Sequence, residues 1–388
     1  MTDRTLTRRS FLTQTLALGA LGALGACAGG KGSAPSATKS STGGRGGTTA
    51  KTQGLLKAAG EGPGGGQLYV SHQRRVVFDE AWGTARGGNK YTPATLVPWA
   101  SAVKPTTCVL VLQLLERGRL ALDDRVAQHI KGFEVAGKQD VTIRHCLTHT
   151  AHLGGYGGPS GLGSFDETVG RIVAAPRGMR GQAPPLGEQA RYNPAGIWIL
   201  AEVVRRIDGR RPFDQLVRQD VYEPCGMVDS WNGIPADRLA AYGDRVVLTG
   251  SPEEAAKPQP AGGGLGPIHD LGRFYEMLLN GGEIDGRRLL KPETVAEMTR
   301  VQAKSGLPWG FGVMINEPSR FGSTPPAGGE RATGPLGMNF GGLASKRAFG
   351  HSGATGSFAF ADPEHGLSYA AIGRIPATEA VYADLGLA

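Results

Sequence analysis

Strand-like segments lie at both ends of the region that follows residue 66, and helix-like segments fill the sequence between them. Near the start, residues 67–71 and 75–78 flank a short polar turn, a pattern typical of a β-hairpin. Near the end, residues 358–361 and 367–372 repeat this pattern, and residues 310–315 are also strand-like. Helices are predicted between them at 195–207, 213–221 and 269–280, and a shorter helix capped by Thr142 is predicted within 141–150. Together these segments predict an α/β (α+β) fold, with an antiparallel sheet assembled from both ends of the chain and an inserted helical region.

The sequence Ser101-Ala102-Val103-Lys104 places a hydroxyl and an amine three residues apart. A serine hydroxyl is a weak nucleophile near neutral pH and needs a neighbour that takes its proton. If a helix begins at Ser101, position i+3 returns to the same face, and the Lys104 amine then lies beside the hydroxyl. Pro105 supports this start, because proline is tolerated only in the first turn of a helix. Since such a short pattern also occurs by chance, a helix start with a solvated lysine remains the alternative.

Residues 1–26 carry the pattern of an export signal. Thr7-Arg8-Arg9-Ser10-Phe11-Leu12 is a twin-arginine signature, and the apolar run that follows is too short to span a bilayer. Cys27 ends a sequence that resembles a lipoprotein box, in which this cysteine becomes the lipid-modified N-terminus. Residues 27–66 are rich in Gly, Ser, Thr and Ala and predict a flexible tether. We therefore expect export by the twin-arginine route and a lipid anchor on the outer face of the cytoplasmic membrane, with secretion as the alternative.

The positive net charge belongs mostly to the N-terminal region. Of the formal +8, residues 1–66 contribute +6, because eight Lys and Arg stand there against two acidic residues. The remainder is nearly neutral, which argues against a nucleic-acid partner. Spaced lysines on a tether that faces anionic lipid account for the charge without any specific partner. The only membrane contact expected is through the N-terminal lipid.

Histidines and cysteines give no evidence for a cofactor. His145, His149 and His152 are closely spaced, but no Asp or Glu lies among them to complete a metal site, so hydrogen-bonded structural roles are favoured over metal binding. The three cysteines after Cys27 lie in apolar surroundings and show no zinc-like pairing. We expect buried free thiols, no metal and no cofactor.

Five segments, taken in order, resemble the serine hydrolases of the class C β-lactamase and penicillin-binding-protein-like superfamily. The superfamily includes DD-peptidases, D-amino-acid-specific peptidases, esterases and acyltransferases. The segments that carry the likeness are Ser101-x-x-Lys104, Thr142 to Thr150, Arg191-Tyr192-Asn193-Pro194-Ala195-Gly196, Gly262-Gly263-Gly264-Leu265 through Leu278-Leu279-Asn280-Gly281-Gly282, and Gly350-His351-Ser352-Gly353. Five ordered matches are far more specific than any one of them.

The resemblance implies a fold and an organisation. The sheet would have five antiparallel strands flanked by helices, with a mostly helical insert. The hydrolase domain would span residues 67–388, with its α/β part at 67–150 and 305–388 and the insert at 151–304.

The resemblance also implies roles for the site residues. Ser101 would attack a carbonyl and form an acyl-enzyme. Lys104 would lower the pKa of the Tyr192 phenol, which would then act as general base and general acid. His351 would orient the substrate or Tyr192, and Gly353 would let a ligand approach the backbone. The backbone N–H groups of Ser101 and Ala354 would form the oxyanion hole.

Two departures from the family pattern bear on the substrate. Relatives usually carry Tyr-x-Asn, whereas Pro194 stands at the third position here, so the carboxamide that holds a substrate amide is missing. An ester is already activated and loses little by this change. We therefore expect an ester rather than a β-lactam substrate. The second departure is His152, where relatives commonly carry Gly.

Four functions remain compatible with the sequence. The first is an extracytoplasmic serine hydrolase of esters or peptide-like amides. The second is a transacylase that uses the same acyl-enzyme, and the third is a DD-peptidase or β-lactamase. The fourth is a non-catalytic, envelope-binding relative.

Overall fold

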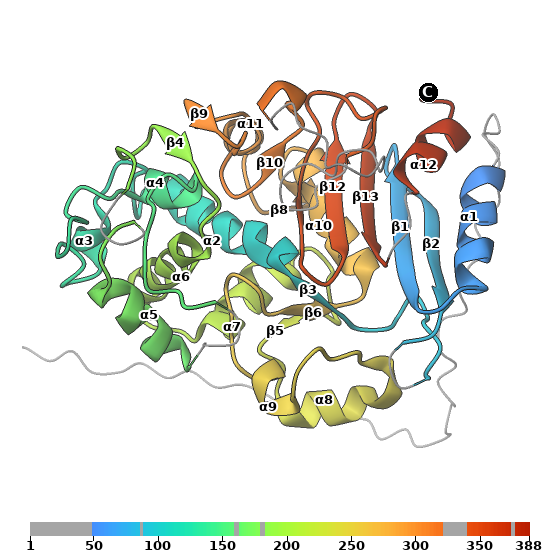
Figure 1. Ribbon diagram of the computed structural model, residues 1–388, viewed down its shortest axis with the longest axis horizontal. Helices are drawn as coiled ribbons and strands as arrows, with labels where there is room; N and C mark the ends of the chain where they lie inside the picture. Colours follow the sequence, from blue (N-terminus) through green and yellow to red (C-terminus); the bar gives the residue numbers. More distant parts are fainter. Residues whose placement is uncertain (1–48, 86–87, 159–162, 179–182, 321–339, 374–376) are drawn as a thin grey trace, which may run out of the picture. The chain divides into compact units, whose positions relative to one another are not determined.

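An antiparallel sheet built from both ends of the chain forms the centre of the structure (Figure 1). The computed structural model describes residues 49–85, 88–158, 163–178, 183–320, 340–373 and 377–388. Within these residues, six strands pair in the order β10-β11-β12-β13-β1-β2. Their bounds are β1 Gly65–His72, β2 Arg75–Gly83, β10 Met314–Ile315, β11 Phe349–Ser352, β12 Ser357–Asp362 and β13 Leu367–Ile372. The predicted antiparallel sheet and both predicted hairpins, β1–β2 and β12–β13, are confirmed.

The predicted number of strands is wrong by one. The short strand β10 adds to the edge of the sheet through Met314 opposite Gly350 and Ile315 opposite Phe349. The strand-like pattern of residues 310–315 predicted a strand here, and the structure forms one at Met314 and Ile315. Its addition to the edge of the sheet depends on β11, which is not adjacent to it in the sequence.

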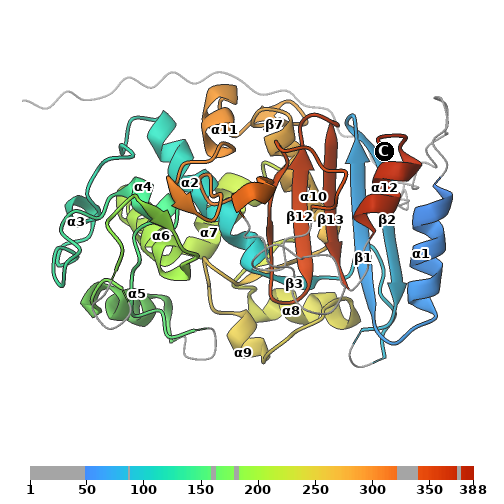
Figure 2. The same ribbon diagram turned by 45° about the horizontal axis from the view of Figure 1, so that its top comes forward.

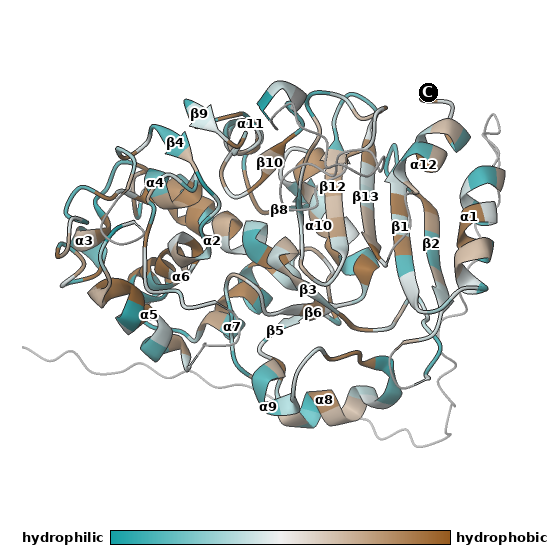
Figure 3. Ribbon diagram, viewed as in Figure 1, coloured by the Kyte–Doolittle hydropathy of each residue, from teal (hydrophilic) through white to brown (hydrophobic). Residues whose placement is uncertain are grey.

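Alternate residues of the central strands face two different layers. Tyr69 of β1 and Ala370 of β13 belong to the large apolar core that includes helix α10 (Ile268–Leu279). Val70 and Tyr369, which lie opposite each other in the register, belong to a second apolar cluster on the other face. This alternation follows from the period of two along a strand. Figure 3 shows hydrophobic residues along the inner strands β12 and β13.

The second face of the sheet is covered by helices from the two ends of the described chain, α1 (Ala50–Gly60) and α12 (Thr378–Asp384), which lie beside β2 and β1 in both views (Figures 1 and 2). The prediction of a flexible tether up to residue 66 is therefore wrong for residues 50–60. Thr52 and Leu56 of α1, one helical turn apart, are buried. The backbone N–H groups of Lys51 and Thr52 donate to the Asp384 carboxylate at 3.2 and 2.7 Å. This cap comes from a residue more than 300 positions away, so local composition cannot reveal it.

The remaining elements form the helical region and its small sheets. Helices α2 and α6 pack against each other in the large core. The helical elements are η1 Ser101–Val103, α2 Lys104–Glu116, α3 Val126–His129, α4 Ile143–Leu147, α5 Phe165–Ala174, α6 Pro194–Asp208, α7 Phe213–Val217, the π-helix η3 Arg218–Tyr222, α8 Ala236–Tyr242, η4 Gly243–Arg245, α9 Pro252–Ala255, α11 Pro292–Met298 and η5 Pro318–Arg320. The short strands are β3 Val97–Ala100, β4 Gln189–Ala190, β5 Trp231–Asn232, β6 Gly264–Gly266, β7 Glu283–Ile284, β8 Arg287–Arg288 and β9 Ser305–Gly306.

Several other expectations can be compared with these elements. The described residues all belong to one unit, residues 47–388. The division into 67–150, 151–304 and 305–388 stays a prediction. The predicted buried thiols are confirmed for Cys108, Cys146 and Cys225. The signal segment 1–26 and Cys27 lie outside the described residues. In the part of the chain that the structure describes, no helix is both long and apolar enough to cross a membrane.

Candidate active site

The chain turns sharply just before Ser101. Strand β3 ends at Ala100, whose φ of 46° and ψ of −130° lie in a region that non-glycine residues rarely adopt. Such a conformation costs about 1–3 kcal/mol and persists only where the surroundings enforce it. The 3-10 turn η1 then begins at Ser101, and α2 follows from Lys104 with Pro105 in its first turn. The predicted helix start near Ser101 is confirmed.

The structure brings Ser101 and Tyr192 together from positions 91 residues apart. The Tyr192 hydroxyl donates to Ser101 Oγ at 2.8 Å. Tyr192 lies in the short link between strand β4 and helix α6, where its side chain reaches back to the start of α2. Two of the three predicted catalytic side chains are therefore in direct contact.

Lys104, the third predicted catalytic residue, is fully buried. Its Nζ donates to the Ala261 carbonyl at 2.6 Å and lies over the Tyr192 ring, 4.9 Å from the ring centre. Burial lowers the pKa of the Lys104 ammonium well below its ordinary value of 10.5. A larger fraction of this amine is therefore neutral near physiological pH, and a neutral amine can accept a proton.

The expectation that Lys104 lowers the pKa of Tyr192 is wrong. Burial raises the pKa of the Tyr192 phenol above its ordinary value of 10, and the hydrogen bond with Ser101 opposes only part of that rise. The physical reason is that burial removes hydration that a phenolate needs, and the nearby Tyr156 raises the pKa of Tyr192 further. In the resting site, Tyr192 is a neutral phenol that donates a hydrogen bond.

Hydrogen bonds to strand β3 hold the turn between β11 and β12 beside Ser101. Thr355 Oγ1 donates to the Pro98 carbonyl at 2.7 Å, and Ser357 Oγ donates to the Trp99 carbonyl at 2.6 Å. A Cβ atom on Gly353 would lie 2.1 Å from the Trp99 carbonyl oxygen, so only glycine fits there. Ala354 is exposed in this turn. The structure thus places the predicted residues Gly353 and Ala354 next to the strand that leads into Ser101, while their roles stay predictions.

His351 lies on β11 behind the phenol. Its side chain is buried, its Nδ1 is 2.6 Å from the Ser352 carbonyl, and its ring centre is 6.0 Å from that of Tyr192. Burial, with a smaller effect from Lys104, lowers the pKa of His351 well below its ordinary value. Of the two roles predicted for His351, this placement favours contact with Tyr192 over direct contact with a substrate.

The structure shows what Pro194 and its neighbour Asn193 do at the start of α6. Pro194 is the first residue of α6, and Asn193 is the N-cap. The Asn193 amide is occupied, because Nδ2 donates to the Leu153 carbonyl at 2.8 Å and Oδ1 accepts from the Ala195 N–H at 2.9 Å. This motif therefore supplies no free carboxamide for a substrate.

The three clustered histidines have separate surroundings. His145 Nδ1 accepts from the Thr142 N–H at 3.1 Å, and His149 Nδ1 bonds to the backbone of Asn193. His152 has a φ of 53°, a backbone conformation that glycine adopts more readily than histidine. Among the described residues, no group of three or more His, Cys, Asp or Glu is arranged to hold a metal ion.

Two neighbours of Tyr192 were not predicted as part of the site. The ring centre of Trp309 lies 6.0 Å from that of Tyr192, and the ring centre of His149 lies 5.2 Å from it. Trp309 belongs to the segment before β10, and His149 follows α4, so neither is close to Tyr192 in sequence. One indication in the sequence that His149 belongs to the site was its place in the Thr142 to Thr150 segment of the family resemblance.

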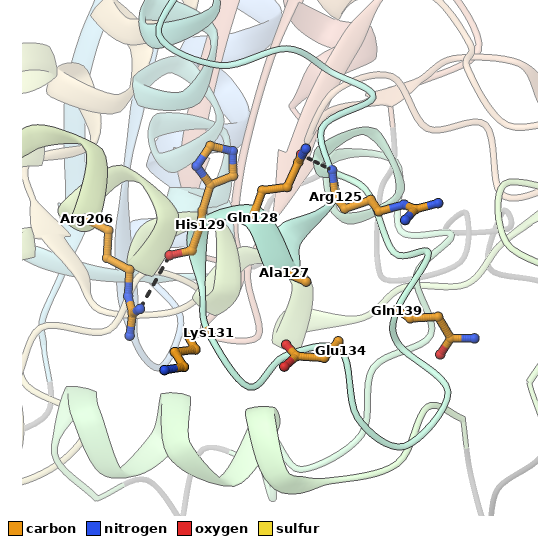
Figure 4. Close-up of a pocket in the computed structure, with 8 residues that line it drawn as sticks. All are labelled: Arg125, Ala127, Gln128, His129, Lys131, Glu134, Gln139 and Arg206. Atoms are coloured by element: carbon orange, nitrogen blue, oxygen red, sulfur yellow. Dashed lines mark hydrogen bonds between the residues drawn. The ribbon is translucent and has the colours of Figure 1, made fainter.

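A shallow surface pocket of about 450 Å³ lies elsewhere (Figure 4). It is lined by Arg125, Ala127, Gln128, His129, Lys131, Glu134, Gln139 and Arg206. None of the predicted catalytic residues lines it. Its lining contains no arrangement of nucleophile and base, so it is not part of the candidate active site.

Comparisons with known proteins agree with this geometry. A family model described as Beta-lactamase matches residues 53–375. The esterase/beta-lactamase LipL of Mycobacterium tuberculosis is 26% identical over 350 residues, which cover 80% of this chain and 76% of that protein. A penicillin-binding protein homologue from Caulobacter crescentus has a TM-score of 0.66 and 28% identity, with 84% of this chain and 91% of that chain covered.

EstCE1, described as a hydrolase with promiscuous acyltransferase activity, has a TM-score of 0.65 and 19% identity, with 87% of this chain and 96% of that chain covered. At this identity the likeness concerns the fold alone. The expected family and fold class are confirmed by the family model and by the penicillin-binding protein homologue.

Proposed function

The chain belongs to the β-lactamase family and is a serine hydrolase, and from this premise we propose that it cleaves esters through an acyl-enzyme on Ser101. The observation that carries the proposal is the 2.8 Å hydrogen bond from the Tyr192 phenol to Ser101 Oγ, beside the buried Lys104. A nucleophile, an acid and a base of suitable chemistry are thereby held within one small site.

The pKa shifts of Lys104 and Tyr192 support a separate role for each of the three residues. Lys104, whose burial favours its neutral form, accepts the proton of the Ser101 hydroxyl as Oγ bonds to the ester carbonyl carbon. The Tyr192 phenol gives its proton to the leaving alkoxide oxygen, and the Lys104 ammonium, 4.9 Å from the ring centre, stabilises the phenolate and returns the proton. Water then attacks the acyl-enzyme by the same route, which restores Ser101 and releases the acid. The backbone N–H groups of Ser101 and Ala354 are proposed to hold the oxyanion.

The structure of the Tyr192 motif supports an ester rather than a β-lactam substrate. A site that hydrogen-bonds the amide of its substrate depends on a side chain that reads this amide. Here the Asn193 carboxamide is occupied by Leu153 and Ala195, and the next residue is Pro194. An ester does not need this contact because its alkoxide leaves readily.

A panel of substrates tests this proposal. We expect turnover of a short-chain p-nitrophenyl ester, no detectable turnover of a chromogenic cephalosporin, and an intact-mass increase equal to one acyl group on the Ser101 peptide. Cephalosporin turnover equal to or faster than ester turnover would contradict the ester preference. An added alcohol or amine that appears in the acylated product would assign acyl transfer in place of hydrolysis.

For localisation we propose export by the twin-arginine route and lipid attachment at Cys27. The support is the sequence Thr7 to Leu12 and the lipoprotein-like residues before Cys27. In cells that express the full chain, we expect labelled palmitate to enter the protein and the protein to partition into detergent. The variant Cys27→Ser should lose both properties, and replacing Arg8 and Arg9 by Lys should keep the chain in the cytoplasm. Label retained by the Cys27→Ser variant would exclude this lipid site.

A further inference from the structure

We propose that His149 is a positioning residue that holds the Tyr192 phenol against Ser101. The proposal rests on the proposed function, because it concerns the same acyl-transfer site. His149 contacts the chain on both sides of Tyr192, and its ring also contacts the Tyr192 ring. None of these contacts is to Ser101 itself.

His149 forms hydrogen bonds with the backbone of both chain neighbours of Tyr192, Arg191 and Asn193. The Arg191 N–H donates to the His149 carbonyl at 3.0 Å. On the other side, His149 Nδ1 accepts from the Asn193 N–H at 3.2 Å or donates to the Asn193 carbonyl at 3.1 Å, according to the tautomer. Either neutral tautomer therefore joins the ring to residue 193.

Tyr192 needs such support because its own segment is irregular. Strand β4 ends at Ala190 and helix α6 begins at Pro194, so Tyr192 lies in a three-residue link without ladder or helix hydrogen bonds of its own. Proline also contributes no backbone N–H to the start of α6. The bonds of His149 to residues 191 and 193 therefore restrain the backbone on both sides of the phenol.

The His149 ring is itself firmly held and uncharged. It is buried, and its ring centre lies 4.5 Å from that of Trp309 in an edge-to-face arrangement. Burial and, to a smaller extent, the nearby Lys104 lower the pKa of His149 to about 3. The ring therefore stays neutral at physiological pH, and in one tautomer Nδ1 keeps the lone pair that accepts from Asn193. His149 also has a φ of 56°, a costly conformation that its surroundings must enforce.

A double-mutant cycle with Tyr192→Phe separates positioning from a general structural effect. We expect His149→Ala to lower kcat for a p-nitrophenyl ester by about 10- to 100-fold with KM changed less than about threefold, because an ångström-scale misplacement can cost about 100-fold. In the Tyr192→Phe background the same substitution should cost less than about twofold. An equal loss in both backgrounds, or full activity of His149→Ala, would overturn the proposal.

Two further variants guard against simple misfolding. His149→Asn keeps a polar atom near the Nδ1 position and tolerates positive φ, so it should recover most of the lost kcat. His129→Ala is the control, because the His129 side chain is mostly buried, lies 3.4 Å from Asp124 Oδ2, and lines the surface pocket away from the candidate active site. We expect it to keep kcat within about threefold. A loss in His129→Ala equal to that in His149→Ala, or no recovery in a folded Asn variant, would count against the proposal.

A crystal structure of a His149 variant provides a readout that does not depend on activity. In His149→Ala we expect the Tyr192 hydroxyl to move out of hydrogen-bond distance from Ser101 Oγ while Ser101 stays in place. A phenol that remains within hydrogen-bond distance in His149→Ala would overturn the positioning role, whatever the enzyme hydrolyses. Absence of ester turnover by the native protein, with a displaced phenol in the variant, would instead count against the proposed function alone.

Discussion

Ser101→Ala is expected to lose ester turnover and covalent labelling by a fluorophosphonate together, with a decrease in kcat/KM of about 10⁴-fold or more. Alanine has no oxygen that can form the acyl-enzyme, so the remaining groups of the site have no nucleophile to activate. The fold should survive, because the Tyr192 ring still packs against His149 and Trp309 when its hydroxyl loses the 2.8 Å hydrogen bond. The measurements are steady-state kinetics, intact mass after labelling, and thermal unfolding.

Ser251→Ala provides a matched control for the loss of a serine hydroxyl. Ser251 is the exposed N-cap of α9, and its Oγ accepts from the Glu254 N–H at 3.3 Å. Removing this cap costs about 1 kcal/mol and leaves the site unchanged. Turnover by the Ser251 variant should stay within about twofold of the native protein. If Ser101→Ala retained labelling or more than a tenth of the native turnover, the nucleophile would be another residue.

Lys104→Met is expected to lower kcat/KM by about 10²- to 10⁴-fold, which is the range for removal of a general base. Methionine fills a similar buried volume but offers no lone pair of comparable basicity. Ser101 and Tyr192 keep their mutual hydrogen bond, so the loss would measure proton transfer rather than the shape of the site. Recovery of activity at high pH in the variant would show that hydroxide replaces the amine.

The same substitution has a characteristic effect on stability. Since burial lowers the pKa of Lys104 in the folded protein, the unfolded chain binds a proton that the folded chain does not, between that lowered pKa and the ordinary value of 10.5. Native stability therefore rises with pH across this window, and the Met variant lacks this contribution. The free energy of unfolding of the variant minus that of the native protein should fall by up to about 1.4 kcal/mol per pH unit as pH rises.

Urea unfolding between about pH 7 and 9 measures this difference. The slope with pH is the useful quantity, because Lys104→Met also leaves the Ala261 carbonyl without its 2.6 Å donor, a cost that does not change with pH. Lys304→Met is the control, since the Lys304 side chain is 72% exposed and pairs with Glu188 at the surface. Its difference from the native protein should stay flat with pH. A flat difference for Lys104→Met would mean that the buried amine is charged in the folded protein.

Patterns within short segments were sufficient for the local elements of the site. Ser101, Lys104 and Pro105 predicted the helix start that η1 and α2 show, because a proline restricts the positions at which a helix can begin. Thr142 was predicted to cap the helix that follows it, and its side chain accepts from the His145 N–H. The two hairpins were recognisable from their alternating residues and polar turns. Each of these depends on interactions between residues close together in the sequence.

Other features depend on partners that are distant in the sequence. The helix α1 was predicted as tether because its own residues are weakly hydrophobic, yet Asp384 caps it and Leu56 is buried beneath it. The edge strand β10 pairs with β11, whose backbone N–H and C=O groups on that side would otherwise lack strand partners. In both cases the partner lies far along the chain, so the local residues show neither the helix cap nor the strand pairing.

The amino-acid sequence determined which groups carry the chemistry: the hydroxyl of Ser101, the amine of Lys104 and the phenol of Tyr192, ordered along a chain of recognisable family. Folding determined the pKa shifts of these groups and the contacts that hold Tyr192 in place. Burial makes the Lys104 amine easier to deprotonate and the Tyr192 phenol harder to deprotonate, the reverse of the expected division of roles. Folding also brings His149 into hydrogen bonds with Arg191 and Asn193, the two chain neighbours of Tyr192. Hydration and long-range contacts set these properties, and neither is encoded in residue type or spacing alone.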